Sequence, residues 1–557
     1  MHHPALLLLV LLTALGENWR MTQSYPIKVG LMLPLDYLQD LIGYGRSVGA
    51  ISIAVDRITQ EQLLPNAEIE FIWYYPECVE YLAAGIAVKL YVNDKIDVII
   101  GPPCSIAAII AGFLGKYYNI PVISWAATDP ALSDQDRFPT FTRTVTSSES
   151  LGRAIVELMD YFGWGEFAMI YNDDQSIRQC KYVREGLKEA IRKRGRHQRI
   201  LDKHTELIEG YSPTDQQLDA FLTEVQRVAR IVVVCLDQNA DKRRLMLAAH
   251  DRGMTSGEYV FILPDDLPEY NAFAIWQDAA RPADGRDADA EKAFRMALMM
   301  EFALVEGAAL DDFKKLVPIK SRDPPWNYTL SDPSDNYGSA YSPFMHDAMY
   351  LYAMAVNRTL SNGGSLRNGT AVIDACRNAV FSGKSGRVVM DAKARRNPAY
   401  RLKGLNDIGK YVTFAELLMY RPDGKGKSAF QTFKPMQSEH EIWATRSGHR
   451  PLSAPECGWN DEKCRDDALL KILLGVGLLL VLLVALSTAV LLIRSRSVDN
   501  QLRMLVWRVN FAELRKMRSR EEESRDLEAE SRSSVISLIS AHCEMSKTIK
   551  KDLYYYK

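Results

Sequence analysis

A long apolar run near the end of the chain constrains this sequence more than any other feature. No charged residue interrupts it from Ile472 to Ile493, and Ala468–Leu470 extends it across Lys471. A helix of about 20 apolar residues crosses a hydrocarbon core ~30 Å thick. Arg494 and Arg496 follow directly, and basic residues beside a span favour the cytoplasmic side. We therefore predict a transmembrane helix over residues 468–493, with the earlier residues outside the cell and residues 494–557 inside.

The amino terminus agrees with this topology. Ala5–Leu15 is apolar but too short to span a membrane, and Ala14 and Gly16 place small residues where a signal peptidase would cut. Because this segment lacks a preceding Lys or Arg, an uncleaved anchor is the alternative. We predict a signal peptide over residues 1–16 and a single-pass type I protein of the plasma membrane.

Overall charge and length limit the classes of function. The 557 residues carry a net charge of −2, and without a basic excess we expect no nucleic-acid partner. Residues 17–467 are numerous enough for two or three domains. Three sequons precede the predicted span and none follows it, as expected for a glycosylated outer region. Their asparagines are Asn327, Asn357 and Asn368.

Cysteine usage fits export to an oxidising compartment. Seven cysteines precede the span and only Cys543 follows it. No CxxC pair is present, so we expect no zinc site. The odd number leaves one outer cysteine unpaired or bonded to a second chain. The seven are Cys78, Cys104, Cys180, Cys235, Cys376, Cys457 and Cys464.

The outer region alternates short apolar runs with helical patterns, which is typical of βαβ units and parallel sheets. The number of strands exceeds one ordinary sheet, so we predict two doubly wound α/β lobes. The first lobe is predicted to contain about residues 26–140, and the chain is predicted to return to it after about residue 265. The second lobe is predicted to contain about residues 145–260 plus strands within Val388–Ala444. Asp284–Ala303 and Ser342–Leu360 are predicted to be helices.

Candidate chemical motifs are few. The spacing of Gly43, Gly45 and Gly49 does not match a dinucleotide-binding loop and favours a tight turn before a helix. Acidic pairs at strand ends, Asp173–Asp174 and Asp265–Asp266, could contact a cationic group, but helix N-caps are the preferred interpretation. No catalytic constellation, metal site or cofactor site is predicted.

The segment from Gly101 to Asp174 resembles a known fold. IPVISWAATDPALSD, then FPTFTRTV, then FGW before a strand are similar to the type I periplasmic-binding-protein fold of eukaryotic receptor ectodomains. That group includes natriuretic-peptide receptors, receptor guanylate cyclases, class C G-protein-coupled receptors and ionotropic glutamate receptors. The resemblance covers most of residues 26–440. It implies a ligand-binding ectodomain over 26–445, with a juxtamembrane segment over 446–467.

Two further segments resemble receptor guanylate cyclases in particular. Pro455–Cys464 is similar to their juxtamembrane cysteine loop, and Gln501–Leu514 to the segment that joins their span to a kinase homology domain. The final KTIKKDLYYYK resembles the start of that kinase-like domain. Residues 494–557 are therefore expected to be a short helical linker and the start of that domain. A tail of this length is too short for a cyclase, so a fragment, a splice form or an incomplete gene model is expected.

By resemblance, Cys78 would pair with Cys104, Cys180 with Cys235, and Cys457 with Cys464, leaving Cys376 over. Natriuretic-peptide receptors hold chloride near the first pair, partly through backbone N–H groups. Pro103 has no N–H here, which argues against that chloride site. Class C receptors bind amino acids through hydroxyl residues of the first lobe, and Ser105 and Thr128 match two such positions, whereas Ala126 replaces a hydroxyl residue usual in glutamate receptors.

The resemblance implies a cell-surface receptor that binds an extracellular peptide or small molecule, forms a homodimer and belongs to a guanylate cyclase making cyclic GMP. A clearance-type receptor with a short tail is the first alternative, and an adhesion protein is the second. After the span, apolar residues at a/d spacing predict a short parallel coiled coil. The alternative is a helix lying on the membrane through Arg503, Arg508 and Arg515. The a/d residues are Val498, Leu502, Leu505, Val509 and Ala512.

Overall fold

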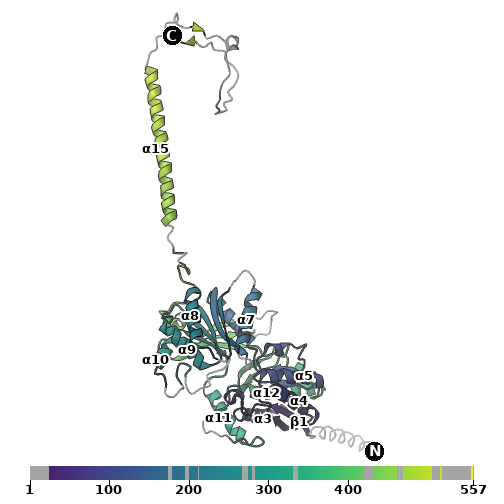
Figure 1. Cartoon of the computed structure of the whole chain (residues 1–557). Coiled ribbons are helices and arrows are strands. Elements are labelled where there is room, and N and C mark those ends of the chain that lie inside the picture. Colours follow the sequence, from purple (N-terminus) through teal and green to yellow (C-terminus); the bar gives the residue numbers. More distant parts are fainter. Residues whose placement is uncertain are drawn as a thin grey trace, which may run out of the picture. The chain divides into compact units, whose positions relative to one another are not determined.

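The computed structural model divides into two units, Met1–Cys464 and Arg465–Lys557. Figure 1 shows the first unit as two α/β lobes. The residues described are 24–173, 178–194, 200–210, 212–265, 274–278, 283–329, 336–419, 432–460, 463–464, 468–504, 515–516 and 554–555. The predicted signal peptide lies outside these residues.

The first lobe contains a five-stranded parallel sheet in the order β2-β1-β3-β4-β5. Parallel neighbours need a crossover between them, and helices supply it. The strands are β1 (Tyr25–Met32), β2 (Ala67–Tyr74), β3 (Val98–Ile100), β4 (Val122–Ser124) and β5 (Phe141–Arg143). The crossover helices are α3 (Gly49–Gln60), α4 (Glu80–Val92) and α5 (Ser105–Tyr118).

The second lobe contains a separate eight-stranded sheet in the order β15-β14-β13-β10-β9-β8-β6-β7. Five strands are parallel: β6 (Glu166–Asp173), β7 (Leu201–Glu209), β8 (Ile231–Cys235), β9 (Val260–Pro264) and β10 (Ala297–Phe302). Three antiparallel strands extend one edge: β13 (Ala399–Leu405), β14 (Tyr411–Leu418) and β15 (Thr432–Pro435). Its helices are α6 (Glu149–Tyr161), α7 (Gln179–Arg194), α8 (Asp215–Val228), α9 (Asn239–Asp251) and α10 (Asp287–Phe294).

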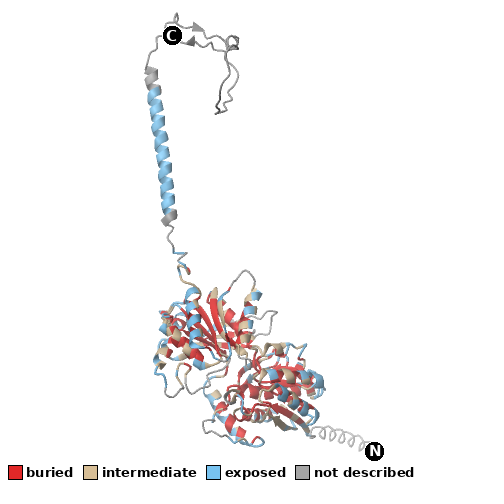
Figure 2. Cartoon of the chain, viewed as in Figure 1, coloured by how far each residue is buried: buried red, intermediate tan, exposed pale blue. Residues whose placement is uncertain are grey.

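Both sheets are covered on both faces, as the apolar strand sequences predict. In β8, Ile231, Val233 and Cys235 face one hydrophobic core while Val232 and Val234 face another. The two-residue period of a strand produces this alternation. Figure 2 shows the resulting buried strands in both lobes. The predicted two-lobed, doubly wound α/β fold is confirmed.

The chain returns to the first lobe at α11 (Ala308–Arg322), followed by α12 (Ser342–Ser361) and α13 (Gly369–Ala375). In α3, Gly49 lies so close to α11 that an added Cβ would collide with the carbonyl oxygen of Val317. A short 3₁₀ turn at Tyr44–Arg46 precedes α3. The glycines therefore permit a turn and a close helix contact, in agreement with the preferred interpretation.

The prediction of one helix over Asp284–Ala303 was wrong. The segment forms α10 and then β10, and all six residues of β10 are buried. Ala, Leu and Met favour a helix locally, but a position between two strands of a sheet that is covered on both faces overrides that preference. The return to the first lobe therefore starts at residue 308 and not near residue 265. A small hairpin, β11 (Val380–Gly383) and β12 (Gly386–Val389), precedes β13.

The second unit contains α15 (Ala468–Met504). Within the described residues, one helix is long and apolar enough to cross a membrane, and its candidate span is Lys471–Val498. Beyond α15, the described residues form a strand pair, Arg515–Lys516 with Tyr554–Tyr555. The linker positions Leu505, Val509 and Ala512 lie outside the described residues, as does Arg508, so the coiled-coil prediction is not tested.

Candidate functional site

The candidate site lies where loops at the carboxyl ends of strands from both lobes contact each other. Open α/β sheets bind ligands at this edge because the strand-to-helix loops gather there. Ser105 starts α5 and its hydroxyl accepts hydrogen bonds from the backbone N–H groups of Thr128 (3.1 Å) and Asp129 (3.2 Å). The structure therefore brings Ser105 and Thr128 together. The lone pairs of the Ser105 oxygen bind the loop that contains Thr128 and Asp129. The O–H group of Ser105 is therefore the part that can donate a hydrogen bond to a ligand.

Asp129 is the link between the lobes at this edge. One carboxylate oxygen accepts from the backbone N–H of Ala131 (2.8 Å), and the other accepts from the hydroxyl of Tyr182 (2.6 Å), which lies on α7 of the second lobe. Burial raises the pKa of Tyr182, and the hydrogen bond to Asp129 raises it further. The phenol is therefore protonated and donates. Neither residue was predicted from the sequence, although Asp129 lies in the loop that follows the carboxyl end of β4 (Val122–Ser124).

Arg143 fixes the loop that carries Asp129. Its guanidinium donates to the carbonyl oxygens of Ala127 (2.7 Å) and Asp129 (2.8 Å) and to the hydroxyl of Ser133 (2.7 Å). Burial lowers its pKa to about 10, so the side chain remains charged at neutral pH. The Asp129 carboxylate is therefore held in place from within the first lobe.

Replacing Tyr182 with Phe should weaken the contact between the lobes. A hydrogen bond to a charged acceptor contributes about 1.5–3 kcal/mol. We expect backbone amide exchange over residues 127–131 to increase by about tenfold or more, measured by hydrogen–deuterium exchange mass spectrometry. Tyr91→Phe is the matched control because its hydroxyl donates within the first lobe, to Ala111. Unchanged exchange in Tyr182→Phe would contradict the role assigned to this contact.

One member of each predicted acidic pair, Asp173 and Asp265, lies at a strand end. Asp173 ends β6 and binds Lys181 (2.9 Å), and Asp265 follows β9 and binds Lys242 (2.9 Å). The preferred N-cap interpretation was wrong for Asp173, because α7 starts only at Gln179 and the carboxylate binds Lys181 of that helix instead. Lys242, the partner of Asp265, belongs to α9, which precedes β9. Asp174 and Asp266 lie outside the described residues.

Each lobe carries a disulfide near this edge. Cys78–Cys104 has a Cα–Cα distance of 5.5 Å, and Cys180–Cys235 one of 5.4 Å. Both pairings are those implied by the family resemblance. Next to the first pair, the carboxylate of Glu77 accepts from the backbone N–H groups of three successive residues. The Glu77 carboxylate of the chain itself is therefore the negatively charged group that binds these N–H groups. The three residues are Leu35, Asp36 and Tyr37.

Cys376 is a free thiol. It is fully buried, and burial raises its pKa to about 12. Of the two alternatives left open by the sequence, the structure favours the free thiol, since a bond to a second chain would require Cys376 to leave the core.

The segment before the membrane contacts the second lobe. Trp164 donates to the carbonyl oxygen of Pro451 (2.9 Å), and Trp459 donates to the carboxylate of Glu166 (2.6 Å). Between Cys457 and Cys464 a third disulfide closes a loop of sequence separation 7. The second lobe is therefore connected to the chain that leads toward α15 through defined side-chain contacts as well as through the backbone.

A buried polar network of the first lobe extends to the hinge, where residues 144–148, 303–307 and 390–398 connect the two lobes. Asp347 is fully buried. It accepts from the backbone N–H groups of Lys384 (2.7 Å) and Ser385 (2.9 Å), from the Ser385 hydroxyl, and it contacts Nδ1 of His346 at 2.8 Å. Arg396 donates to the Ser385 hydroxyl (2.6 Å) and to the Thr144 carbonyl (2.6 Å).

The three sequon asparagines differ in exposure. Asn327 and Asn368 are exposed, whereas Asn357 is half-buried within α12. Asn368 also caps α13 through its side-chain oxygen. Modification of Asn327, Asn357 and Asn368 remains a prediction.

Comparison with known proteins identifies the family. Residues 46–408 match the family described as the receptor family ligand-binding region. Receptor-type guanylate cyclase gcy-13 of Caenorhabditis elegans is 32% identical over 76% of this chain and 41% of its own length. Receptor-type guanylate cyclase gcy-7 of the same organism is 26% identical over 96% of this chain and 49% of its own length.

The family match and the two-lobed fold with its hinge identify this region as the ligand-binding region of a receptor. The chain belongs to the receptor family ligand-binding region family, and its similarity to receptor-type guanylate cyclases supports the predicted receptor guanylate cyclase ectodomain. It spans about two fifths to one half of the length of these curated relatives.

Proposed function

We propose that this chain is the ligand-binding and membrane-anchoring part of a receptor guanylate cyclase. The observation that carries the proposal is the order of parts: a two-lobed ligand-binding region, a cysteine loop, and an apolar helix that fits a membrane. Ligand binds between the lobes, where Ser105 and Thr128 contact it. The change in the lobes reaches a cyclase that produces cyclic GMP in the cytoplasm.

Coupling to the membrane runs through the second lobe. Trp459 contacts Glu166 at the start of β6, and the guanidinium of Arg230 lies 5.0 Å from the Trp459 ring centroid. These contacts support the transfer of a lobe movement to the Cys457–Cys464 loop and then to the span. The linker after the span continues this path, either as a coiled coil through Leu502 and Leu505 or as a membrane-surface helix.

The proposed orientation is single-pass type I in the plasma membrane. An epitope tag placed after Gly16 should be detected on intact cells, and a tag after Lys557 only after permeabilisation. Detection of the second tag on intact cells would contradict this orientation.

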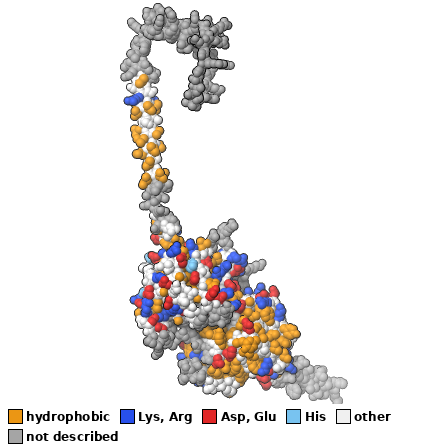
Figure 3. Space-filling view, in the orientation of Figure 1, with side chains coloured by type: hydrophobic (Ala, Val, Ile, Leu, Met, Phe, Trp, Pro, Cys, Tyr) orange, Lys and Arg blue, Asp and Glu red, His pale blue; other side chains and the backbone are white. Residues whose placement is uncertain are grey.

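We also propose a homodimer formed through the outer face of α4 and α5. Figure 3 shows hydrophobic side chains gathered on the lobe that carries these helices. Tyr81 is 75% exposed and Tyr117 is 80% exposed. Exposed apolar patches of this kind mark interaction sites. A second copy is the occupant we favour because a two-fold interface uses the same patch on both chains. The other exposed members are Leu82, Val88, Val92, Ile106, Phe113 and Tyr118.

A Tyr81→Arg/Tyr117→Arg variant should therefore be monomeric. In a two-fold interface each substitution appears in both chains, so the like charges repel and lose hydration. We expect the mass of the purified chain, measured by light scattering in detergent, to fall by half. Ile408→Arg is the control, since Ile408 is 77% exposed on the second lobe. A dimer that survives the double substitution would exclude this face.

The central test is the transcript beyond Lys557. We expect an open reading frame that continues into a kinase-like and a cyclase domain, and cyclic GMP when the complete frame is expressed in cells. A stop codon at this point in full-length transcripts would overturn the cyclase proposal and favour the short-tailed clearance receptor. In the complete receptor, Leu502→Ser/Leu505→Ser should uncouple ligand binding from cyclic GMP output if the linker is a coiled coil.

A further inference from the structure

We propose that Glu77 is a positioning residue for the ligand-binding edge of the first lobe, where its carboxylate serves as a built-in anion that holds the loop after β1. The part of this role that concerns a ligand rests on the proposed function. Glu77 is half-buried in the loop after β2. One of its carboxylate oxygens accepts from the backbone N–H of Leu35 (2.6 Å), and the other accepts from those of Asp36 (3.2 Å) and Tyr37 (3.1 Å). Three successive donors, 40 to 42 positions away in the sequence, therefore converge on one carboxylate.

The loop that Glu77 holds lies where the first sheet changes its direction of winding. In the strand order, β1 stands between β2 and β3. The helix after β1, α3, packs in the core on one face of the sheet, whereas α4 and α5 pack in the core on the other face. The chain therefore leaves β1 and β3 toward opposite faces. Open α/β sheets bind ligands at the carboxyl ends of two such strands, and residues 35–37 follow β1 there while Ser105 follows β3.

The backbone at Glu77 is held in a conformation that its sequence does not favour. Glu77 has a φ of 47° and Cys78 a φ of 60°, and this left-handed region is unfavourable for residues other than glycine. The carboxylate hydrogen bonds and the disulfide between Cys78 and Cys104 hold the two residues there. Cys104 directly precedes Ser105, whose hydroxyl binds the backbone N–H of Asp129. Glu77 is therefore connected to both loops of this edge.

A negative charge suits this arrangement better than a neutral acceptor. Successive backbone N–H groups that converge on one point form a concavity that binds anions. Hydrogen bonds from N–H groups to a carboxylate are about twice as strong as those to a neutral acceptor. Because this anion is part of the chain, the loop is held without an ion from solution.

The first test is hydrogen–deuterium exchange of the purified full chain in detergent, measured by mass spectrometry. In Glu77→Ala we expect the amides of residues 35–37 to exchange about tenfold faster or more, because they lose a charged acceptor. The amides of Thr128 and Asp129 should also exchange faster, by a smaller factor. Glu77→Gln keeps the size of the side chain without its charge and should give an increase between those of Glu77→Ala and the unmodified chain. Glu80→Ala is the matched control, since Glu80 is exposed three residues further on.

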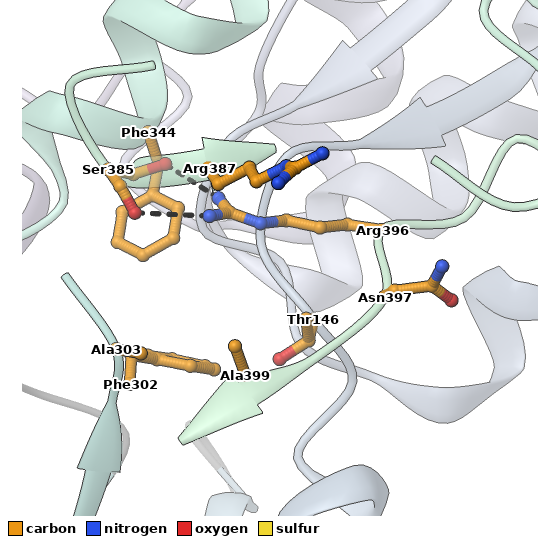
Figure 4. A pocket seen from close by; sticks show the side chains of 9 residues that line it. All are labelled: Thr146, Phe302, Ala303, Phe344, Ser385, Arg387, Arg396, Asn397 and Ala399. Atoms are coloured by element: carbon orange, nitrogen blue, oxygen red, sulfur yellow. Dashed lines mark hydrogen bonds between the residues drawn. The ribbon is translucent and has the colours of Figure 1, made fainter. Parts of the chain in front are cut away.

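Rescue by a free carboxylate distinguishes a built-in anion from a merely structural contact. Sodium formate replaces sodium gluconate, a bulkier anion, at constant ionic strength. In Glu77→Ala, about 0.3 M formate should slow exchange of residues 35–37 by about threefold, since a ligand that refills the site protects it by mass action. Formate should have no effect on the unmodified chain, where Glu77 already occupies these N–H groups. The hinge near Ser385 and Arg396 (Figure 4) is the internal reference, because the N–H groups of Lys384 and Ser385 donate to Asp347 and should exchange at the same rate in every variant.

Four results would overturn the proposal. The first is unchanged exchange at residues 35–37 in Glu77→Ala, and the second is full protection in Glu77→Gln. The third is the absence of formate rescue in Glu77→Ala. The fourth is exchange at Thr128 and Asp129 that stays unchanged or rises only together with that of Lys384 and Ser385, since Glu77 would then not act on this edge in particular. These measurements need no ligand and no cyclase activity, so a failure of the receptor proposal would leave them unchanged.

Discussion

An Asp347→Ala substitution should destabilise the outer region by about 3–5 kcal/mol, because it removes one partner of a buried, charged network. The backbone N–H groups of Lys384 and Ser385 and the Ser385 hydroxyl would lose their common acceptor in a site without access to water. Urea denaturation followed by tryptophan fluorescence would measure the loss. Asp374→Ala is the control, since Asp374 is 48% exposed in its ion pair with Arg377, and surface changes of this kind stay within about 0.5 kcal/mol.

This loss should depend on pH. Burial alone would raise the pKa of Asp347, but the hydrogen bond and charge of His346, the hydrogen bond from Ser385 and the charge of Arg396 outweigh it and lower the pKa. A carboxyl group whose pKa is lower in the folded state than in the unfolded state stabilises the fold at pH values above its unfolded-state pKa, which is about 3.9 for Asp. This stabilisation disappears as the pH falls through the folded-state pKa. The difference between Asp347→Ala and the unmodified chain should therefore be full at pH 7 and shrink below about pH 4. A difference that stays constant from pH 7 to pH 3 would contradict this account.

A Trp164→Ala substitution should cost about 3–5 kcal/mol as well, since it leaves a large cavity in the second lobe. Trp164 is 2% exposed, and its ring centroid lies 4.9 Å from that of Phe162 and 5.9 Å from that of Trp443. The same substitution removes the hydrogen bond to Pro451. We therefore expect faster amide exchange over residues 451–460 in addition to a lower urea midpoint.

Trp164→Phe separates the two effects. It keeps much of the ring packing but not the indole N–H, so the loss of stability should be smaller while exchange near Pro451 still rises. Leu452→Ala is the neighbouring control, because Leu452 is 52% exposed. If Trp164→Phe left exchange over residues 451–460 unchanged, the indole hydrogen bond would not be what holds this segment to the second lobe.

Local patterns predicted most elements of the fold correctly. The predicted alternation of apolar strands and helices is found, for example, in β8 (Ile231–Cys235) and α5 (Ser105–Tyr118), and the helix predicted over Ser342–Leu360 is α12 (Ser342–Ser361). These elements succeed because their apolar periodicity and end signals are local: Asn119 ends α5 in a left-handed conformation with a φ of 53°. The segment around β10 failed because strand and helix compete there on composition, and only its neighbours in the sheet decide between them.

The candidate site was only partly predictable. Ser105 and Thr128 were found by resemblance, and they do lie together. Asp129 and Tyr182 were missed because they are 53 positions apart and belong to different lobes. The hinge contact between the Arg396 guanidinium and the Thr144 carbonyl oxygen was not predictable for the same reason, since the two residues are 252 positions apart.

The sequence by itself determined the membrane-spanning candidate and the alternation of strands and helices. Each of these depends on residues close together in the chain, since hydrophobic periodicity and span length are local quantities. The tertiary structure alone decided which lobe β10 joins, that Tyr182 reaches Asp129, and that the Glu77 carboxylate binds the N–H groups of residues 35–37. Those relations arise from packing between distant segments, where burial and the need to satisfy polar groups select one arrangement that no local pattern encodes.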